Sequence, residues 1–138
     1  MSTEPAAEDQ SVEVLIVDDN EDAANSLAML LELEDVEAAI AADAEAALRL
    51  LERVRPTLLL IDIGLPGMSG YELAKRVRKH PATREATLIA LTGRDAPADP
   101  DANGFDQFWT KPFDPKKLLE AIKTVLERKR SCVPESGS

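Results

Sequence analysis

The sequence predicts an α/β domain in which helices cover both faces of a doubly wound, five-stranded parallel sheet. Short apolar runs alternate along the chain with longer segments whose apolar residues recur at helical spacing. Leu, Ala, Val and Ile dominate the apolar residues and only 4% of all residues are aromatic, a composition that suits helices packed on a parallel sheet. A chain of 138 residues fits one domain with a single modest core.

Five short apolar runs predict the strands, because each is rich in aliphatic or aromatic residues. They cover residues 13–17, 36–41, 57–61, 87–91 and 107–110. Strands that alternate with helices imply right-handed crossovers and an open parallel sheet. We expect residues 12–130 to form the folded domain, 1–11 a disordered N-terminal arm and 131–138 a flexible C-terminal tail.

Four segments predict helices, because their apolar residues recur three or four positions apart and form one stripe. These residues are Leu27, Leu30 and Leu31, then Ala47, Leu51 and Val54, then Leu73 and Val77, and finally Leu118, Ile122, Val125 and Leu126. A residue able to cap a helix N-terminus precedes each segment, namely Asp22, Asp43, Ser69 and Asp114. Pro115 follows the last of them, and proline is favoured at the first helical position.

The charge and composition exclude several classes of partner. The formal net charge is -10 and the sequence pI is about 4.6. Nucleic acids and anionic membranes attract clusters of Lys and Arg, so both are disfavoured as partners. No apolar run approaches the ~18 residues of a membrane span, the N-terminus does not resemble a signal peptide, and the lone Cys132 cannot form an internal disulfide. We therefore expect a cytoplasmic protein.

Polar side chains follow four of the predicted strands. Asp18 and Asp19 follow the first strand, Asp62 the third, Thr92 the fourth and Lys111 the fifth. Each has a structural explanation by itself, because aspartates and threonine cap helices or open turns and a lysine is usually solvated. In doubly wound sheets, however, ligands bind beyond the carboxyl ends of the strands. We therefore expect all five side chains to converge on one crevice.

The grouping of these residue types predicts a magnesium site used in phosphoryl transfer. Like charges 4 Å apart repel by about 4 kcal/mol at an effective dielectric near 20. Three clustered carboxylates must therefore take up protons or hold a cation. Oxygen ligands without Cys or His favour Mg²⁺, which also takes a substrate phosphate. A lysine and a hydroxyl at the same place supply charge neutralisation and hydrogen-bond donors for the phosphoryl oxygens.

Four motifs, with their order and spacing, resemble one known family. The motifs are "VDDNEDA", "LLLIDIGLPGMSGYEL", "ALTG" and "FWTKPF". From about residue 13 to 130 the chain resembles a response-regulator receiver domain of bacterial two-component signalling, similar to the chemotaxis regulator. The resemblance implies a flavodoxin-like sheet with strand order 2-1-3-4-5 and a stand-alone receiver, since no further domain follows the last predicted helix.

The resemblance also implies a role for each site residue. Asp62 is the expected phosphoacceptor, and Asp18, Asp19 and Asp62 with the backbone carbonyl of Gly64 are the expected ligands of Mg²⁺. Thr92 and Lys111 are expected to bind the phosphoryl group. The expected switch residues are Thr92, Phe108 and Pro112, where Phe108 is the aromatic rotamer switch and Lys111–Pro112 is a cis peptide.

The mechanism that the resemblance implies is attack of Asp62 on a phosphohistidine of a sensor histidine kinase or a histidine phosphotransfer protein. The donor must be external, because the only histidine, His80, is expected to be a surface residue or a helix C-terminal cap. The protein is then no enzyme beyond its own phosphorylation and autodephosphorylation. It acts on an unknown downstream protein, through a two-state change in which Phe108 turns inward.

Two segments depart from the family pattern. Residues 93–104, "GRDAPADPDANG", contain two prolines and no apolar side chain larger than alanine, so the helix usual between the fourth and fifth strands is expected to be short or absent, with a mobile loop in its place. Asp35 stands where the family often uses glycine after the first helix. Asp tolerates a left-handed backbone less well than glycine, which leaves the turn geometry open.

Two other classes of function remain as alternatives. A phosphohydrolase similar to haloacid dehalogenases would use Asp62 as nucleophile, but it needs a second acid two residues later, where Gly64 stands. A pseudo-receiver would bind a partner without phosphorylation, which the intact set of acids, Thr92 and Lys111 argues against. A nucleotide-binding enzyme is disfavoured, because neither "GxxxxGK" nor "GxGxxG" occurs.

Overall fold

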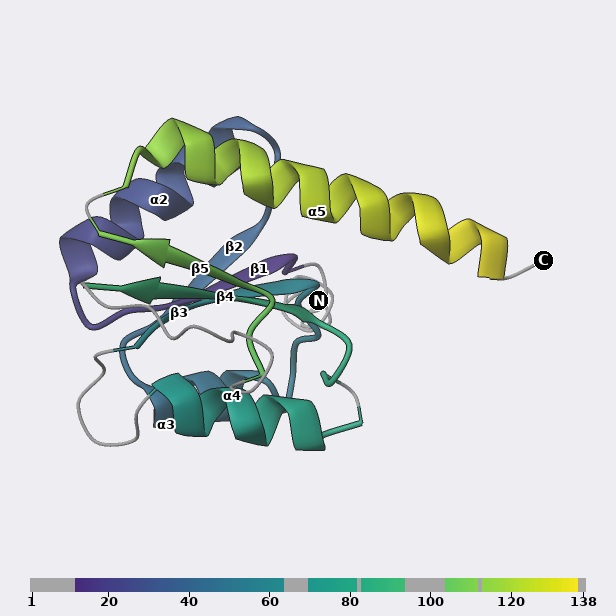
Figure 1. Cartoon of the computed structure of the whole chain (residues 1–138), viewed down its shortest axis with the longest axis horizontal. Helices are drawn as coiled ribbons and strands as arrows, with labels where there is room; N and C mark the ends of the chain where they lie inside the picture. The colour runs from purple at the N-terminus through teal and green to yellow at the C-terminus, as the bar shows by residue number, and fades with distance from the viewer. Residues whose placement is uncertain (1–11, 64–69, 82, 94–103, 112, 137–138) are drawn as a thin grey trace, which may run out of the picture.

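The computed structural model describes residues 12–63, 70–81, 83–93, 104–111 and 113–136, with side chains up to Arg128. Its centre is one parallel sheet of β1 (Val14–Val17), β2 (Ala38–Ala41), β3 (Leu58–Asp62), β4 (Thr87–Thr92) and β5 (Gln107–Thr110). The strand order is β2-β1-β3-β4-β5 (Figure 1). This confirms the predicted doubly wound fold and its order 2-1-3-4-5.

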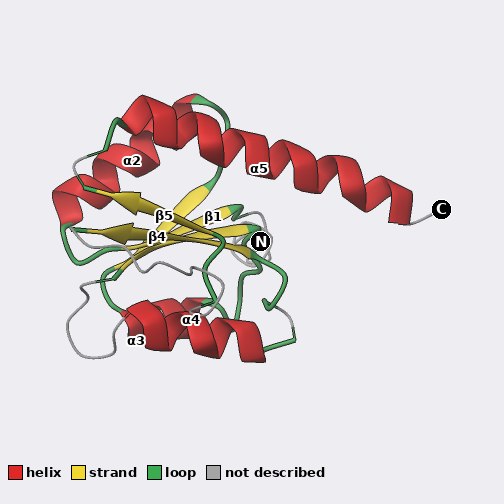
Figure 2. Cartoon of the chain, viewed as in Figure 1, coloured by secondary structure: helices red, strands yellow, loops and turns green. Residues whose placement is uncertain are grey.

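Four helices in the described part of the chain cover the sheet in two layers. They are α2 (Glu21–Leu33), α3 (Ala44–Leu50), α4 (Gly70–Lys79) and α5 (Pro115–Ser136). The helices α2 and α5 lie on one face of the sheet, and α3 and α4 lie on the other (Figure 2). The helix expected to be short or absent between β4 and β5 falls on residues 94–103, outside the described residues. Within the described part, no helix is long and apolar enough to cross a bilayer.

The strands divide the interior into two cores, because successive side chains along a strand point to opposite faces. On the face of α3 and α4, strand residues such as Leu59, Ile61 and Leu88 pack together. On the face of α2 and α5, the alternate residues, such as Leu60 and Ile89, do so. Both faces of the central strands are therefore buried, as parallel sheets require.

The predicted helix starts are mostly right, with one error. Asp43 caps α3, since its Oδ1 accepts a hydrogen bond from the backbone N–H of Ala46 at 2.8 Å. Asp114 precedes α5 and its Oδ1 accepts from the N–H of Lys116 at 3.0 Å. Asp22 is wrong as a cap, because Asn20 caps α2 through the N–H of Ala23 at 3.1 Å. The helix begins two residues earlier than expected, and Ser69 lies outside the described residues.

The last helix continues further than its sequence suggested. The expected tail began at residue 131, but the backbone of α5 is helical through Ser136. Figure 1 shows the C-terminal part of α5 extending away from the sheet. No glycine occurs between Gly104 and Gly137, so no flexible residue ends the helix near Arg130. The last buried side chain that the structure describes on α5 is Leu126.

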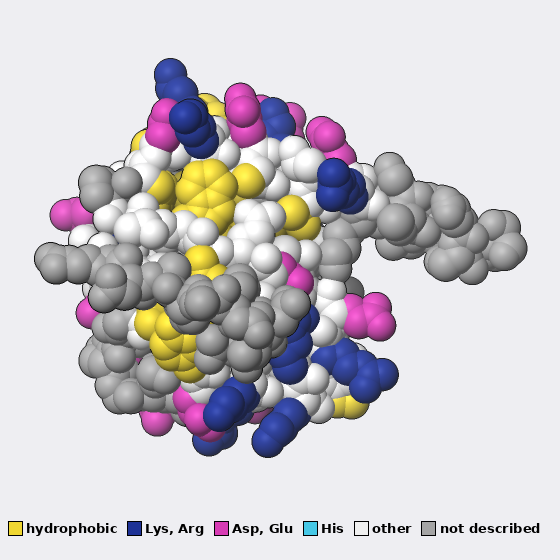
Figure 3. Space-filling model, in the orientation of Figure 1, with side chains coloured by type: hydrophobic (Ala, Val, Ile, Leu, Met, Phe, Trp, Pro, Cys, Tyr) yellow, Lys and Arg dark blue, Asp and Glu magenta, His cyan; other side chains and the backbone are white. Residues whose placement is uncertain are grey.

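Lys and Arg side chains gather at the lower edge of the face shown in Figure 3, in the region of α4. The last turn of α4 holds Arg76, Arg78 and Lys79. Cations at this end complement the partial negative charge of a helix C-terminus.

The turn after α2 forms without glycine. Asp35 has a positive φ of 64°, the N–H of Asp35 donates to the carbonyl of Glu32 at 3.0 Å, and the N–H of Val36 donates to that of Leu31 at 2.9 Å. These two bonds are the Schellman pattern that ends a helix with a left-handed residue. Val36 is thus part of the turn, which explains why β2 begins two residues later than predicted.

We expect Asp35→Gly to raise the free energy of unfolding by about 0.5–1 kcal/mol, because glycine adopts a positive φ without the steric penalty of a Cβ atom. Urea denaturation measures this change. The variant Asp35→Ala is the control, since alanine keeps the penalty and gives no such gain. Equal stability of the glycine and alanine variants would contradict the explanation.

Candidate functional site

Three carboxylates meet at the carboxyl ends of β1 and β3. Asp18 and Asp19 follow β1, and Asp62 is the last residue of β3. Val17 and Ile61 are paired in the parallel register, so the acids that follow them lie side by side at the ends of adjacent strands. One oxygen from each of the three lies within 4.8 Å of the others. The convergence that the sequence predicted for the acids is confirmed.

The three acids differ in their exposure and hydrogen bonding. Asp18 is buried, with 3% of its surface exposed, Asp62 is half-buried and Asp19 is exposed. The backbone N–H of Asn20 donates to Oδ1 of Asp18 at 2.9 Å and orients that carboxyl group. Burial raises the pKa of Asp18 above its usual value; the Asn20 bond and the charge of Lys111 lower it in part, and the nearby Asp62 raises it again.

Lys111 supplies a positive charge to this cluster. Its Nζ lies 3.3 Å from Oδ2 of Asp62 and 3.8 Å from Oδ2 of Asp18. Its backbone N–H donates to the carbonyl of Thr92 at 2.7 Å, which ties the end of β5 to the end of β4. One lysine neutralises only one of the three carboxylates when all are ionised, so a divalent cation fits the remaining charge. The donors are hard oxygens, which suits Mg²⁺.

The other predicted site residues separate into two groups. Thr92 ends β4 and is buried, at a position that alternation places with Leu88 and Ala90 on the α3 and α4 face. Phe108 packs against the same core and is paired with Ala90 in the register of β4 and β5. The apolar residues around Lys111 belong to the opposite face of the sheet, that of α2 and α5. Gly64 and Pro112 fall outside the described residues.

Gly70 is a site residue that the sequence reasoning missed. It is the first residue of α4, and a Cβ atom built there would lie 2.8 Å from the carbonyl oxygen of Asp62 and 2.9 Å from Cα of Ile63. Its N–H donates to the carbonyl of Ile63 at 3.4 Å. The start of α4 therefore packs directly against the backbone of Asp62 and Ile63, with no space for a side chain at Gly70. The only signal in the sequence was a poor helix former at a helix start.

A sequence model of the response regulator receiver domain matches residues 14–123 of the chain. The chain belongs to this family. Receiver domains are the phosphoacceptor modules of two-component signalling, and they are signalling modules rather than enzymes. The acid cluster of this receiver domain is consistent with that role.

Individual proteins similar to this receiver domain support the assignment. An uncharacterised 14.6 kDa protein of Leptolyngbya boryana is 38% identical over 115 residues, which cover 81% of this chain and 88% of that protein. The sensory transduction protein RegX3 of Mycobacterium tuberculosis is 38% identical over 118 residues, 83% of this chain but 51% of RegX3. The chain thus spans about half the length of that relative.

A solved structure shows the same fold. The CheY-like receiver domain protein of Methanospirillum hungatei superposes with a TM-score of 0.77 at 33% identity, and the match covers 87% of this chain and 98% of that one.

A cavity of about 410 Å³ adjoins the receiver site on the α2 and α5 face. Leu27, Leu30 and Phe113 line it, and Asp18 and Lys111 also contribute to its wall. The charged groups of the site therefore border a largely apolar hollow on this face.

The raised pKa of Asp18 predicts a pH-dependent stability. A carboxyl group whose pKa is higher in the folded state than in the unfolded state binds its proton more tightly in the folded protein. The protonated group therefore favours folding at low pH, and this contribution is lost as the pH rises through the folded pKa. At pH 7 without metal we therefore expect Asp18→Asn to raise the free energy of unfolding, on the order of 1 kcal/mol. The asparagine oxygen still accepts the N–H of Asn20.

Urea denaturation of both proteins from pH 7 down to about pH 3 measures this difference, since free carboxyl groups titrate near pH 4. The gain should shrink as the pH falls and Asp18 of the parent protein becomes protonated. An advantage of the asparagine variant that stays constant with pH would contradict the assignment of the cost to the charge.

Proposed function

We propose that this receiver domain takes a phosphoryl group from a phosphohistidine onto Asp62 and then changes its contacts with another protein. The observation that carries the proposal is Oδ2 of Asp62 at 3.3 Å from Nζ of Lys111, inside a cluster of three carboxylates. The phosphodonor is a sensor histidine kinase or a histidine phosphotransfer protein. The setting is cytoplasmic, the downstream target is a protein, and neither nucleic acid nor membrane takes part.

Among the three acids, Asp62 fits the role of nucleophile best. Asp18 is buried, with 3% of its surface exposed, so a phosphodonor has little access to its carboxylate. Asp19 is exposed and no ion pair with Lys111 is found for it in the described residues. Asp62 is partly accessible, and the ammonium group of Lys111 lies next to one of its oxygens. Asp62 then serves as the acceptor, and Asp18 and Asp19 serve as metal ligands.

The reaction is a displacement at phosphorus. An oxygen of Asp62 forms the new O–P bond while the N–P bond to the donor imidazole breaks, and the imidazole nitrogen keeps the bonding electrons and later takes a proton. The ammonium group of Lys111 faces the charge that develops on the phosphoryl oxygens. A Mg²⁺ ion held by Asp18, Asp19, Asp62 and the carbonyl of Gly64 would supply further neutralisation of that charge.

The phosphorylated state is read through the switch residues. The hydroxyl of Thr92 binds the phosphoryl group, and the space that it leaves allows the ring of Phe108 to turn inward, with Lys111–Pro112 as the cis peptide that shapes the end of β5. Phosphorylation adds nearly two negative charges, which shifts the balance between two conformations. The protein catalyses no reaction other than its own phosphorylation and autodephosphorylation.

We expect Mg²⁺ to stabilise the unphosphorylated protein, because a ligand that binds only the folded state adds about 1.4 kcal/mol at tenfold its dissociation constant. A thermal melt at increasing MgCl₂ measures the effect. In Asp19→Asn, which removes an exposed ligand without disturbing the core, the stabilisation should need a higher Mg²⁺ concentration. An identical response of both proteins would contradict a metal site at these acids.

Incubation with acetyl phosphate and Mg²⁺, followed by mass spectrometry of the intact protein, tests the proposed function against its alternatives. A labile mass increase of one phosphoryl group supports the receiver function. No adduct would favour a pseudo-receiver that binds its partner without phosphorylation. Sustained turnover of unrelated phosphoesters would favour a phosphohydrolase with Asp62 as nucleophile.

A further inference from the structure

Three aromatic rings form a row on the α3 and α4 face of the sheet. Tyr71, in the first turn of α4, and Phe105, just before β5, meet edge to face with ring centroids 6.1 Å apart. Phe105 in turn meets Phe108 edge to face at 5.3 Å. Phe105 is 1% exposed and belongs to the core of this face, and the other two rings are half-buried against it. The ring of Phe105 therefore lies between α4 and Phe108.

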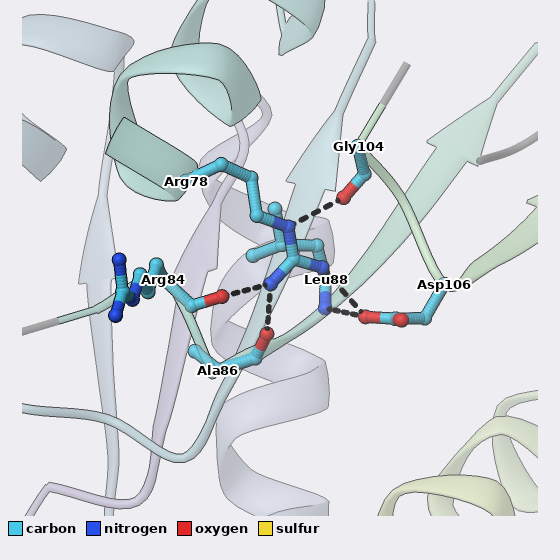
Figure 4. Close-up of polar contacts among 6 residues, drawn as sticks. All are labelled: Arg78, Arg84, Ala86, Leu88, Gly104 and Asp106. Atoms are coloured by element: carbon cyan, nitrogen blue, oxygen red, sulfur yellow. Dashed lines mark hydrogen bonds and ion pairs between the residues drawn. The ribbon is translucent and has the colours of Figure 1, made fainter. Parts of the chain in front are cut away.

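A single arginine of the same helix binds the residues on both sides of Phe105, through the backbone of Gly104 and the side chain of Asp106. Arg78, near the C-terminal end of α4, donates from Nε to the carbonyl of Gly104 at 2.9 Å and from Nη2 to Oδ2 of Asp106 at 2.8 Å (Figure 4). Its Nη1 donates to the carbonyls of Arg84 and Ala86. The same oxygen of Asp106 accepts the N–H of Leu88 at 2.8 Å.

These bonds leave Phe105 little freedom to move away from α4. A guanidinium group with this many fixed acceptors, one of them a carboxylate, is held more firmly than a surface ion pair. Gly104, which has a φ of 84°, and Asp106 flank Phe105 directly in the chain. The position of the Phe105 ring is therefore set by α4, through Tyr71 at one end of the helix and Arg78 at the other.

The opposite end of this connection touches the phosphoacceptor. Gly70 begins α4, and the space for its missing Cβ is taken by the carbonyl of Asp62 and Cα of Ile63. Tyr71 is the next residue. A displacement of the backbone at Asp62 or Ile63 thus meets the start of α4 without an intervening side chain, and α4 holds Phe105 against Phe108.

We propose that Phe105 is a positioning residue for Phe108, and that α4 forms a second route by which the state of Asp62 reaches Phe108, separate from the route through Thr92. The inference rests on the proposed function, since it concerns the regulation of the same site. In the unphosphorylated protein the Phe105 ring occupies the space on the α4 side of Phe108 and limits its inward rotation. Phosphorylation relieves this limit when α4 shifts at Gly70.

The variant Phe105→Leu tests this role, because leucine leaves space beside Phe108 but keeps the site apolar. Trp109, the only tryptophan of the sequence, follows Phe108 directly and contacts Phe113 on the other face, so its fluorescence reports on this part of β5. Before any phosphoryl donor is added, we expect the variant to show roughly half or more of the emission change that phosphorylation causes in the parent protein.

A second readout separates this role from simple loss of packing. If Phe108 already turns inward, less energy is needed to phosphorylate Asp62, so the extent of phosphorylation by acetyl phosphate should be equal or higher. Leu31→Val is the control, since it shrinks a fully buried side chain of α2, in the core on the opposite face of the sheet from α4. It should show the parent emission before and after phosphorylation.

Tyr71→Leu is the milder second variant, should Phe105→Leu fail to fold, because Tyr71 is only half-buried. It should shift the emission in the same direction, and the double variant should shift it by less than the sum. If a folded Tyr71 or Phe105 variant shows the same emission response as the parent, the inference is overturned. The proposed function still stands in that case, provided that the parent protein forms the adduct. Absence of any adduct on the parent overturns the proposed function itself.

Discussion

The Asp62→Asn variant is expected to take up no phosphoryl group from acetyl phosphate, although it folds. Asparagine has nearly the size of aspartate, but its amide carries no negative charge and is not a nucleophile under these conditions. The change also removes one of three carboxylates whose oxygens lie within 4.8 Å of one another, which relieves repulsion with Asp18. We therefore expect the free energy of unfolding to equal that of the parent or to exceed it, by an amount on the order of 1 kcal/mol.

Intact-protein mass spectrometry after incubation with acetyl phosphate and Mg²⁺ measures the loss, and urea denaturation measures the stability. Asp22→Asn is the matched control, because Asp22 is an exposed aspartate in the first turn of α2 and lies outside the acid cluster. It should be phosphorylated at the parent rate. An adduct of undiminished yield on Asp62→Asn would mean that Asp18 or Asp19 is the acceptor, and peptide mapping would identify which.

The Gly70→Ala variant is expected to lose both stability and phosphorylation rate. A Cβ atom 2.8 Å from the carbonyl oxygen of Asp62 requires that α4 or the end of β3 move. Overpacking of this kind costs about 1–3 kcal/mol, more than the gain of up to about 1 kcal/mol that alanine brings to a helix over glycine. Because the crowded oxygen belongs to the backbone of Asp62, a movement at the end of β3 also changes the position of the Asp62 carboxylate relative to Lys111.

The same measurements on Gly93→Ala provide the comparison. Gly93 follows β4, no atom lies within 4 Å of the Cβ position, and its φ is outside the positive range. This variant should match the parent in phosphorylation rate and be equally or slightly more stable. If Gly70→Ala behaved like Gly93→Ala, the close approach of α4 to Asp62 would have no consequence, and the route proposed through Tyr71 and Phe105 would lose its starting point.

Several parts of the fold were predictable because they depend on short stretches of sequence. The apolar run before Asp18 and the one before Asp62 predicted β1 and β3 to within one residue, since a buried strand in a parallel sheet is apolar at almost every position. The errors arose where two local interpretations compete. Asn20 and Asp22 both cap helices well, and the helix took the earlier one. Val36 looked like strand but completes a helical turn.

The candidate site was predictable in its members, because polar residues at strand ends stand out against apolar runs and a doubly wound sheet brings those ends together. Their motifs also carried the resemblance to receiver domains, which led us to expect Asp62, rather than the other two acids, to be the phosphoacceptor. The differences among these acids were not readable from the sequence. Burial of Asp18 and the contact between Asp62 and Lys111 depend on how deep each strand end lies.

By itself, the sequence determined which segments are strands and helices and which acids and lysine end the strands, because spacing and residue type act over a few positions. Only the tertiary structure decided that α4 begins against the backbone of Asp62, and that Arg78 holds Gly104 and Asp106, 26 and 28 residues away along the chain. It alone also placed Phe105 between Tyr71 and Phe108. Such contacts join segments brought together by strand order and register, and no local pattern specifies which distant atoms will fill the same space.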